Sequence, residues 1–321
     1  MVSTVLVTGA SGFVGSALAT ALVEAGHRVR AMTRHADRYR GPGEPVQADV
    51  ADPGSLDRAL DGVDVAYYLV HSLDSGDFVA KDAQAARSFS AAAARAGVQR
   101  IIYLGGLGAE DSDLSDHLRS RREVEELLGT DGVPVTVLRA AIVIGHGGIS
   151  WEITRQLVAH LPAMVVPRWA TTKTQPIALA DVVRYLVGVL EPEEAKGRVF
   201  EIGGSEVLTY AEMMQRVAKQ HHHRTLPMVT VPLLTPRLSS HWLAFVTDVD
   251  TGTARNLIDS MSNEVVVHEH SIRELVPGEP MDYTAAVEAA YAQRAAARDQ
   301  QQAPAPGRPR RPVPGERSPT A

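Results

Sequence analysis

Short apolar runs alternate with stretches of helical periodicity along the first two thirds of the chain. The runs are rich in Val, Ile and Leu, as in buried strands, and the apolar residues between them recur at three- or four-residue spacing, as on one helix face. This pattern predicts strands at Val5–Val7, Val29–Met32, Pro45–Gln47, Ala66–Val70, Ile101–Leu104, Val135–Leu138 and Val199–Ile202. Strands that alternate with helices form a parallel sheet covered on both faces, with ligands at the carboxyl ends of the strands. We therefore expect an α/β fold with a doubly wound parallel sheet.

Local signals mark where the predicted helices begin and end. The first helix has apolar residues at four-residue spacing from Val14 and closes on Gly26, which suits the left-handed position after a helix end. Asp52 followed by Pro53 is typical of a cap and first helical turn.

The same pattern divides the chain into parts. Residues 1–145 carry the regular alternation and residues 176–205 return to it, so we assign both to the sheet domain. Residues 146–175 and 206–295 have looser helical patterns, and we interpret them as a smaller lobe that faces the substrate. Residues 296–321 are rich in Pro, Gln and Arg and cannot bury apolar surface, so they are predicted to be disordered.

Composition narrows the classes of function. The 321 residues carry a net charge of -6, which gives no electrostatic reason to expect a nucleic acid as partner. The chain has no cysteine, which excludes disulfides, thiolate metal sites and a cysteine nucleophile. Consecutive histidines at 221–223 do not share a helix face, so we interpret them as an exposed helix end and expect no metal site.

No apolar stretch reaches the roughly 18 to 20 residues that a spanning helix needs. The best candidate lies at 231–247, where Arg237 and His241 interrupt it. The sequence allows two interpretations of this segment. It covers a cleft, or it forms a surface that faces a partner or a membrane. The first residues run directly into a strand with no basic n-region, so we expect a cytoplasmic protein without a transmembrane segment.

A glycine-rich loop joins the first predicted strand to the first helix. In "TGASGFVG" the glycines allow a tight turn, close approach of the backbone to a phosphate and close packing of helix on strand. The helix N-terminus then faces the phosphates of a bound dinucleotide. We assign cofactor binding here to Gly9, Ser11, Gly12, Phe13, Val14 and Gly15.

The spacing of these glycines resembles that of the short-chain dehydrogenase/reductase superfamily. The segments "AYYLVHSL", "IIYLGGLG", "HLRSR", "LRAAIVIG", "PRWATTKTQPIALADVVRYLV" and "FEIGGSEVLTYAEMM" are similar to its atypical, NmrA-like branch, whose members are related to extended epimerases. The resemblance covers roughly residues 3–275 and implies a Rossmann fold that binds NAD(P)H. The resemblance implies a small-molecule substrate but does not identify it. It also implies a possible homodimer, since extended relatives often form homodimers.

The end of the second strand bears on which nicotinamide cofactor is bound. An NAD-preferring site has a carboxylate there, whereas this chain has Thr33 and Arg34. A guanidinium grips a 2'-phosphate through two donors, so we expect NADP(H) rather than NAD(H). The alternative is that Arg34 is a solvated surface charge.

The resemblance also implies contacts with the rest of the cofactor. Residues at the ends of the third, fourth and fifth strands are expected to border it, namely Asp49, Val50, Leu69, Val70, His71 and Gly105. Asp49 is also open to interpretation as a turn residue.

The place of the family's catalytic residues has different chemistry in this chain. Active relatives use a Tyr, a Lys four residues later and a Ser or Thr, where this chain has His117, Arg121 and the pair Gly105 and Gly106. An imidazole with a pKa of about 6.5 suits acid or base work near neutral pH. Arg121 cannot lose its proton, but it can hold a ribose or polarise a carbonyl. The alternative is that this pair only binds the nicotinamide ribose.

Three further residues are candidates for a substrate pocket. His146 follows the sixth strand, and Arg168 and Trp169 lie in the smaller lobe. The glycines around His146 are also typical of a plain turn, and Trp169 of a core residue.

Two functions therefore remain open. The first is an NADP(H)-dependent oxidoreductase that transfers hydride to a small organic acceptor such as a quinone or carbonyl compound. The second is a non-catalytic NADPH-binding redox sensor or scaffold, as the resemblance to NmrA-like regulators and to an accessory subunit of respiratory complex I implies.

Overall fold

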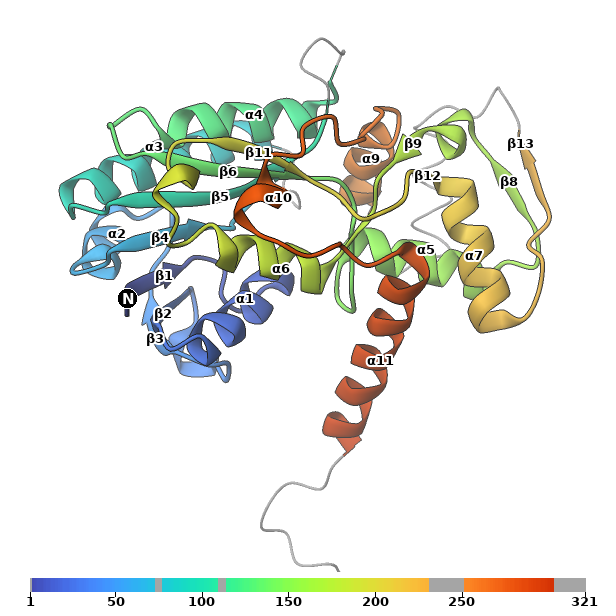
Figure 1. Ribbon diagram of the computed structural model, residues 1–321, viewed down its shortest axis with the longest axis horizontal. Helices are drawn as coiled ribbons and strands as arrows, with labels where there is room; N and C mark the ends of the chain where they lie inside the picture. The colour runs from blue at the N-terminus through green and yellow to red at the C-terminus, as the bar shows by residue number, and fades with distance from the viewer. Residues whose placement is uncertain (1, 73–76, 109–113, 231–250, 303–321) are drawn as a thin grey trace, which may run out of the picture.

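A seven-stranded parallel sheet forms the centre of the molecule (Figure 1). The computed structural model describes residues 2–72, 77–108, 114–230 and 251–302. In spatial order the strands are β11 (Val199–Ile202), β6 (Val135–Ala140), β5 (Arg100–Gly106), β4 (Val65–Tyr68), β1 (Thr4–Val7), β2 (Arg28–Thr33) and β3 (Glu44–Gln47). All seven strands overlap the predicted ones, although β4 ends at Tyr68, two residues before the predicted end at Val70. The expected doubly wound fold is confirmed, and the chain reverses direction across the sheet between β1 and β4, where ligands bind in such folds.

Two layers of helices cover the sheet. Figure 1 shows α3 (Phe78–Arg95) and α4 (Asp116–Leu128) on one face, with α2 (Pro53–Leu60) beside them, and α1 (Phe13–Glu24) with α6 (Leu179–Gly188) on the other. Alternation along β1 supplies both cores, because Val5 and Val7 pack on the α1 side while Leu6 packs on the α2 side. The short helices η1 (Ala36–Arg38), η3 (Glu193–Ala195) and α10 (Ile272–Leu275) lie in the connections.

The predicted helix ends are confirmed. Gly26 follows α1 with a φ of 88°, in the left-handed region that favours glycine. The Asp52 carboxylate accepts a hydrogen bond from the backbone N–H of Gly54 at 3.1 Å, and Pro53 begins α2.

A second hydrophobic core lies beyond the carboxyl end of the sheet. It is formed by α5 (Ile149–His160), α7 (Tyr210–His222), α9 (Thr251–Ser260) and α11 (Tyr283–Gln302), with Trp151 and Val287 among its buried members. The remaining elements are the strand pairs β7 (Val143–Ile144) with β10 (Ile177–Ala178), β8 (Met164–Val166) with β13 (Met228–Thr230), and β9 (Lys173–Thr174) with β12 (Leu208–Thr209), and the turn η2 (Arg168–Thr171).

The C-terminal helix extends further than the sequence indicates. Residues 296–302 continue α11, although disorder is predicted to begin at 296. Alanine, arginine and glutamine favour helix, and this local propensity carries the helix to Gln302. Residues 303–321 and the apolar segment 231–247 lie outside the described residues. Within the described parts of the chain, no helix is both long and apolar enough to cross a membrane.

Candidate functional site

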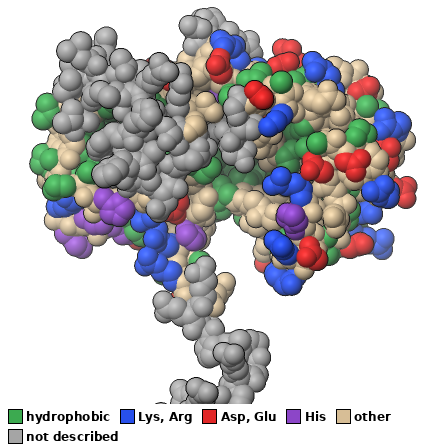
Figure 2. All heavy atoms as spheres, turned by 180° about the vertical axis from the view of Figure 1, so that it is seen from behind, with side chains coloured by type: hydrophobic (Ala, Val, Ile, Leu, Met, Phe, Trp, Pro, Cys, Tyr) green, Lys and Arg blue, Asp and Glu red, His purple; other side chains and the backbone are tan. Residues whose placement is uncertain are grey.

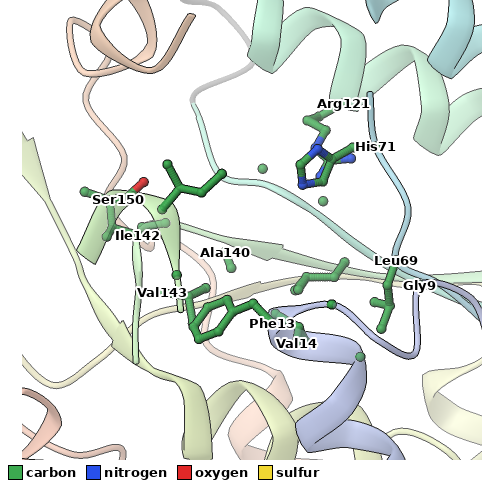
Figure 3. Close-up of a pocket in the computed structure, with 18 of the residues that line it drawn as sticks. Gly9, Phe13, Val14, Leu69, His71, Arg121, Ala140, Ile142, Val143 and Ser150 are labelled. Atoms are coloured by element: carbon green, nitrogen blue, oxygen red, sulfur yellow. The ribbon is translucent and has the colours of Figure 1, made fainter. Parts of the chain in front are cut away.

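A cavity of about 450 Å³ lies at the carboxyl ends of β1, β4, β5 and β6 (Figure 3). Its walls come from the loop after β1, the ends of the three other strands, the first turns of α4, the turn at 145–148 with the start of α5, and α9. Residues brought together here come from sequence positions as distant as Gly9 and Leu257. We call this cavity the cleft.

The glycine loop forms one side of the cleft. Gly9 has a φ of 62°, and the N–H of Gly12 donates to its carbonyl at 2.8 Å. A Cβ atom on Gly15 would stand 2.2 Å from the Gly9 carbonyl oxygen, so only glycine lets α1 begin this close to the loop. Because Gly12 caps α1 without a side chain, the first backbone N–H groups of the helix are left for an anion.

Phe13 connects the glycine loop with the opposite wall. A Cβ atom on Gly145 would lie 3.0 Å from the Phe13 ring, and one on Gly148 would lie 2.8 Å from it. The glycines of "GHGG" therefore let the turn at 145–148 pack directly on this ring. Phe13 and Val14 line the cleft, whereas Ser11 is exposed and is not among the lining residues.

The residues predicted to surround the adenosine half lie along neighbouring strand ends. Leu69 lines the cleft, and its N–H donates to the Thr8 hydroxyl at 2.8 Å. Thr8 is a positioning residue that the sequence reasoning missed, although its place directly before the glycine motif is a usable signal. Val70 packs in the α2-side core. The Asp49 carboxylate accepts a hydrogen bond from the N–H of Ala51 at 2.9 Å, as a turn residue does. Val50, the next residue, is partly buried against the α2-side core.

Thr33 and Arg34 stand at the carboxyl end of β2, next to β1 in the sheet. The Thr33 hydroxyl accepts from the N–H of His35 at 3.3 Å. The Arg34 side chain is exposed and therefore accessible to a ligand at this edge.

His71, His117 and Arg121 all line the cleft at the ends of β4 and β5. Figure 3 shows the Arg121 side chain, from α4, pointing toward His71, which follows β4. The Arg121 guanidinium donates to the Tyr103 hydroxyl at 3.4 Å and lies 5.9 Å from the centre of that buried ring. Tyr103 thus fixes Arg121, a role that the sequence reasoning missed.

Glycines at the expected Ser/Thr place allow α4 to approach β5. A Cβ atom on Gly106 would stand 2.8 Å from Leu118 and 3.6 Å from the Cγ of Arg121. Gly105 and Gly106 therefore line the cleft with backbone alone.

Both histidines of the cleft are uncharged near neutral pH. Burial, with the charge of Arg121 and the ring of His71, lowers the pKa of His117 to about 3. Burial among the atoms of the cleft and the Arg121 charge also lower the pKa of His71 to about 3, although His71 as a residue is exposed to solvent and the effect of burial is therefore weaker there than at the half-buried His117. A neutral imidazole donates one N–H hydrogen bond but is a weak acid, so Arg121 is the fixed positive charge on this wall.

The wall of the cleft formed by residues 141–143, the start of α5 and α9 is largely apolar. It consists of Ala141, Ile142, Val143, Ile149, Ser150 and Leu257. His146 is not among the lining residues, because its ring turns to Glu152, 3.1 Å away. Trp169 packs edge-on against Tyr210 in the second core, with ring centres 5.7 Å apart. The side chain of Arg168 lies outside the described residues.

Comparison with known proteins decides the family. The sequence profile of the NAD(P)H-binding family matches residues 9–191, more than half of the chain. The chain belongs to the NAD(P)H-binding family. This confirms the resemblance seen in the sequence, and the Gly9–Gly15 cradle fits the dinucleotide, since the close helix start leaves backbone N–H groups for its phosphates.

Two proteins similar in sequence to this chain are reductases by name. A (4-alkanoyl-5-oxo-2,5-dihydrofuran-3-yl)methyl phosphate reductase of Streptomyces griseus is 32% identical over 227 residues, covering 67% of this chain and 73% of the relative. Sanguinarine reductase of Eschscholzia californica is 27% identical over 250 residues, covering 62% of this chain and 88% of the relative.

Solved structures share the fold. An NADPH-dependent quinone oxidoreductase of Escherichia coli, solved with NADPH, superposes with a TM-score of 0.73 at 22% identity, covering 88% of this chain and 98% of that one. Triphenylmethane reductase of a Citrobacter species gives a TM-score of 0.74 at 18% identity, covering 91% and 99%.

Proposed function

We propose that this protein is an NADP(H)-dependent reductase whose acceptor is a small conjugated compound, a quinone or an unsaturated carbonyl. The observation that carries the proposal is the composition of the cleft, where Arg121 and two neutral histidines face an otherwise apolar wall. NADPH, when bound, supplies the hydride. The acceptor's developing negative charge is the part of the reaction that the chain's own residues must stabilise.

A conjugated acceptor suits these residues better than a simple ketone does. Hydride addition to a simple ketone leaves charge on one oxygen, which requires a proton donor matched to neutral pH. Neither histidine is such an acid, given pKa values of about 3. A conjugated acceptor spreads its charge over several atoms, and a permanent guanidinium stabilises that charge without proton transfer. Arg121 takes this role, and His117 donates a hydrogen bond.

The relatives support reduction as the reaction class. Two of them are named as reductases, and one neighbour of the same fold is named as a quinone oxidoreductase with NADPH. Together with Arg34 at the end of β2, the NADPH in that neighbour supports a preference for NADP(H) over NAD(H). His146 and Trp169 receive no role in this proposal.

A non-catalytic NADPH-binding function is favoured by one observation, the replacement of all three standard catalytic groups. The two functions differ in turnover, not in cofactor binding. The experiment that separates them follows NADPH oxidation with a quinone, an enone and a saturated ketone as acceptors. We expect turnover of the first two and little of the third. NADPH binding without oxidation by any acceptor would overturn the reductase and support the sensor or scaffold.

A further inference from the structure

The turn at 145–148 closes the acceptor side of the cleft. Gly147 and Gly148 line the cleft, and the chain continues through Ile149 and Ser150, which line it as well. A turn with three glycines has many conformations open to it, although within it the N–H of Gly148 donates to the Gly145 carbonyl at 3.1 Å. Contacts from outside the turn, the Phe13 ring among them, narrow these conformations to the shape that forms this wall.

The carboxylate of Glu152, in the first turn of α5, contacts the turn at 145–148 that precedes this helix. The Oε1 atom of Glu152 accepts from the N–H of Gly147 at 3.4 Å and lies 3.1 Å from Nδ1 of His146. Because an ionised carboxylate only accepts hydrogen bonds, Nδ1 of His146 carries the proton. Only 18% of the Glu152 side chain is exposed, so these contacts are sheltered from solvent.

The second oxygen of the same carboxylate connects to α11. Oε2 of Glu152 accepts from Nε of Arg155 at 2.7 Å and from Arg294 on α11 at 3.2 Å. The side-chain oxygen of Gln293, also on α11, accepts from the backbone N–H of His146 at 3.0 Å. Figure 2 shows basic and histidine side chains gathered where α11 leaves the body of the molecule.

Glu152 remains ionised in this setting. Burial opposes its charge, but the hydrogen bond and charge of Arg155, with the hydrogen bonds from His146 and Gly147, outweigh it and lower the pKa of Glu152. All four contacts therefore hold at neutral pH as hydrogen bonds to a charged acceptor.

We propose that Glu152 is a positioning residue that sets the acceptor wall of the cleft, and that α11 acts on acceptor affinity through it. The carboxylate fixes the turn at 145–148 against α11, which contributes no residue to the cleft lining. The kinetic part of this inference rests on the proposed reductase function. The structural part does not, because it concerns the conformation of the turn in the protein alone.

Amide hydrogen exchange tests the structural part in the full chain. In Glu152→Ala, the peptide that spans residues 145–150 is expected to exchange about tenfold faster than in the wild type. The reason is the loss of two hydrogen bonds to the carboxylate, one from the backbone N–H of Gly147 and one from the side chain of His146. Arg294→Ala should accelerate the same peptide less. Glu152→Gln, which still accepts from Gly147, should lie between the alanine variant and the wild type.

Glu288→Ala is the matched control. Glu288 is also a carboxylate at the α7–α11 contact, where its side-chain oxygen accepts from Gln220 at 2.5 Å and lies 3.7 Å from His221, and both of these partners belong to α7 and not to the turn. The inference is overturned if exchange at 145–150 is unchanged in Glu152→Ala, or if Glu288→Ala accelerates it equally. Should Glu152→Ala fail to fold, Glu152→Gln and Arg294→Ala give the same comparison.

Steady-state kinetics test the second part. In Glu152→Ala, KM for the acceptor is expected to rise about tenfold while kcat and the dissociation constant of NADPH change by less than about twofold. A loss of NADPH binding equal to the rise in KM would overturn a role confined to the acceptor wall. Faster exchange without turnover of any acceptor, in the wild type as well, would retain the positioning role and reject the proposed function.

Discussion

The guanidinium of Arg121 donates to the buried hydroxyl of Tyr103, in the middle of β5, at 3.4 Å. The contact joins the charged end of this α4 side chain to a buried residue of the central sheet. Any function of Arg121 therefore depends in part on Tyr103, which does not line the cleft.

Replacement of Arg121 should slow the reaction more than replacement of Tyr103. We expect Arg121→Met to lower kcat/KM for a quinone by about 100-fold, the usual loss when a group that stabilises developing charge is removed. Tyr103→Phe keeps the charge of Arg121 but removes the hydroxyl that holds it in place, so kcat/KM is expected to fall about fivefold. Equal effects of the two variants would contradict a direct role for the charge. The measurement is the initial rate of NADPH oxidation over a range of acceptor concentrations.

The uncharged state of His117 should make stability depend on pH. Its folded pKa of about 3 lies below the unfolded value of about 6.5, so the unfolded chain binds the proton first as pH falls. The free energy of unfolding therefore has its full value above about pH 6.5, where His117 is neutral in both states. It falls between about pH 6.5 and 3, where the unfolded chain alone binds the proton. Relative to the wild type, His117→Gln should gain up to about 1.4 kcal/mol in free energy of unfolding per pH unit in this window. Urea denaturation of the cofactor-free protein at pH 7 and pH 5 measures this; a parallel loss in both proteins would refute it.

Cofactor preference should depend on Arg34. We expect Arg34→Ala to weaken NADPH binding about 10- to 100-fold and to leave NADH binding nearly unchanged, because only NADPH carries the 2'-phosphate. Arg38→Ala is the control, since Arg38 is an exposed arginine in the neighbouring η1, where its side chain is 80% exposed. Titration of each cofactor by fluorescence, with the wild type and both variants, gives the six dissociation constants. An unchanged ratio of NADPH to NADH affinity in Arg34→Ala would remove Arg34 from the site.

Gly15 should tolerate no side chain. The added Cβ of Gly15→Ala would meet the Gly9 carbonyl at 2.2 Å, so we expect a loss of about 1 to 3 kcal/mol in stability and loss of NADPH binding. Gly54→Ala is the control, because Gly54 also lies in the first turn of a helix and its added Cβ would have no contact closer than 3.5 Å. Thermal unfolding with and without NADPH compares the two. A Gly15→Ala protein that NADPH still stabilises as in the wild type would argue against the cradle.

Signals that act over a few residues predicted the fold well. The apolar runs located every strand of the large sheet, and Gly26 and Asp52 marked their helix ends because both signals work through the neighbouring backbone. The glycine motif located the loop for the same reason. At 296–302 the polar composition predicts disorder, but the helix propensity of these residues continues α11 to Gln302, so the predicted boundary lies too early.

Contacts between distant segments could not be predicted in the same way. His146 was expected at the substrate, but its ring is drawn to Glu152, whose other contact, Arg294, lies far along the chain. Leu257 reaches the cleft from α9, and Tyr103 acts through a side chain on α4. Such pairs depend on how elements pack, which hydrophobic periodicity alone does not specify. The roles of His117 and Arg121 in catalysis stay predictions.

Phe13 has a consequence for how the two ligands of the cleft affect each other. Its ring belongs to the loop that cradles the dinucleotide and packs on Gly145 and Gly148 of the opposite wall. A shift of the loop that moves this ring also moves the surface that the acceptor meets. Coupling of this kind is reciprocal, so whatever factor NADPH contributes to acceptor affinity, the acceptor contributes to NADPH affinity. One aromatic ring thus links the affinities of the two ligands, whichever of them binds first.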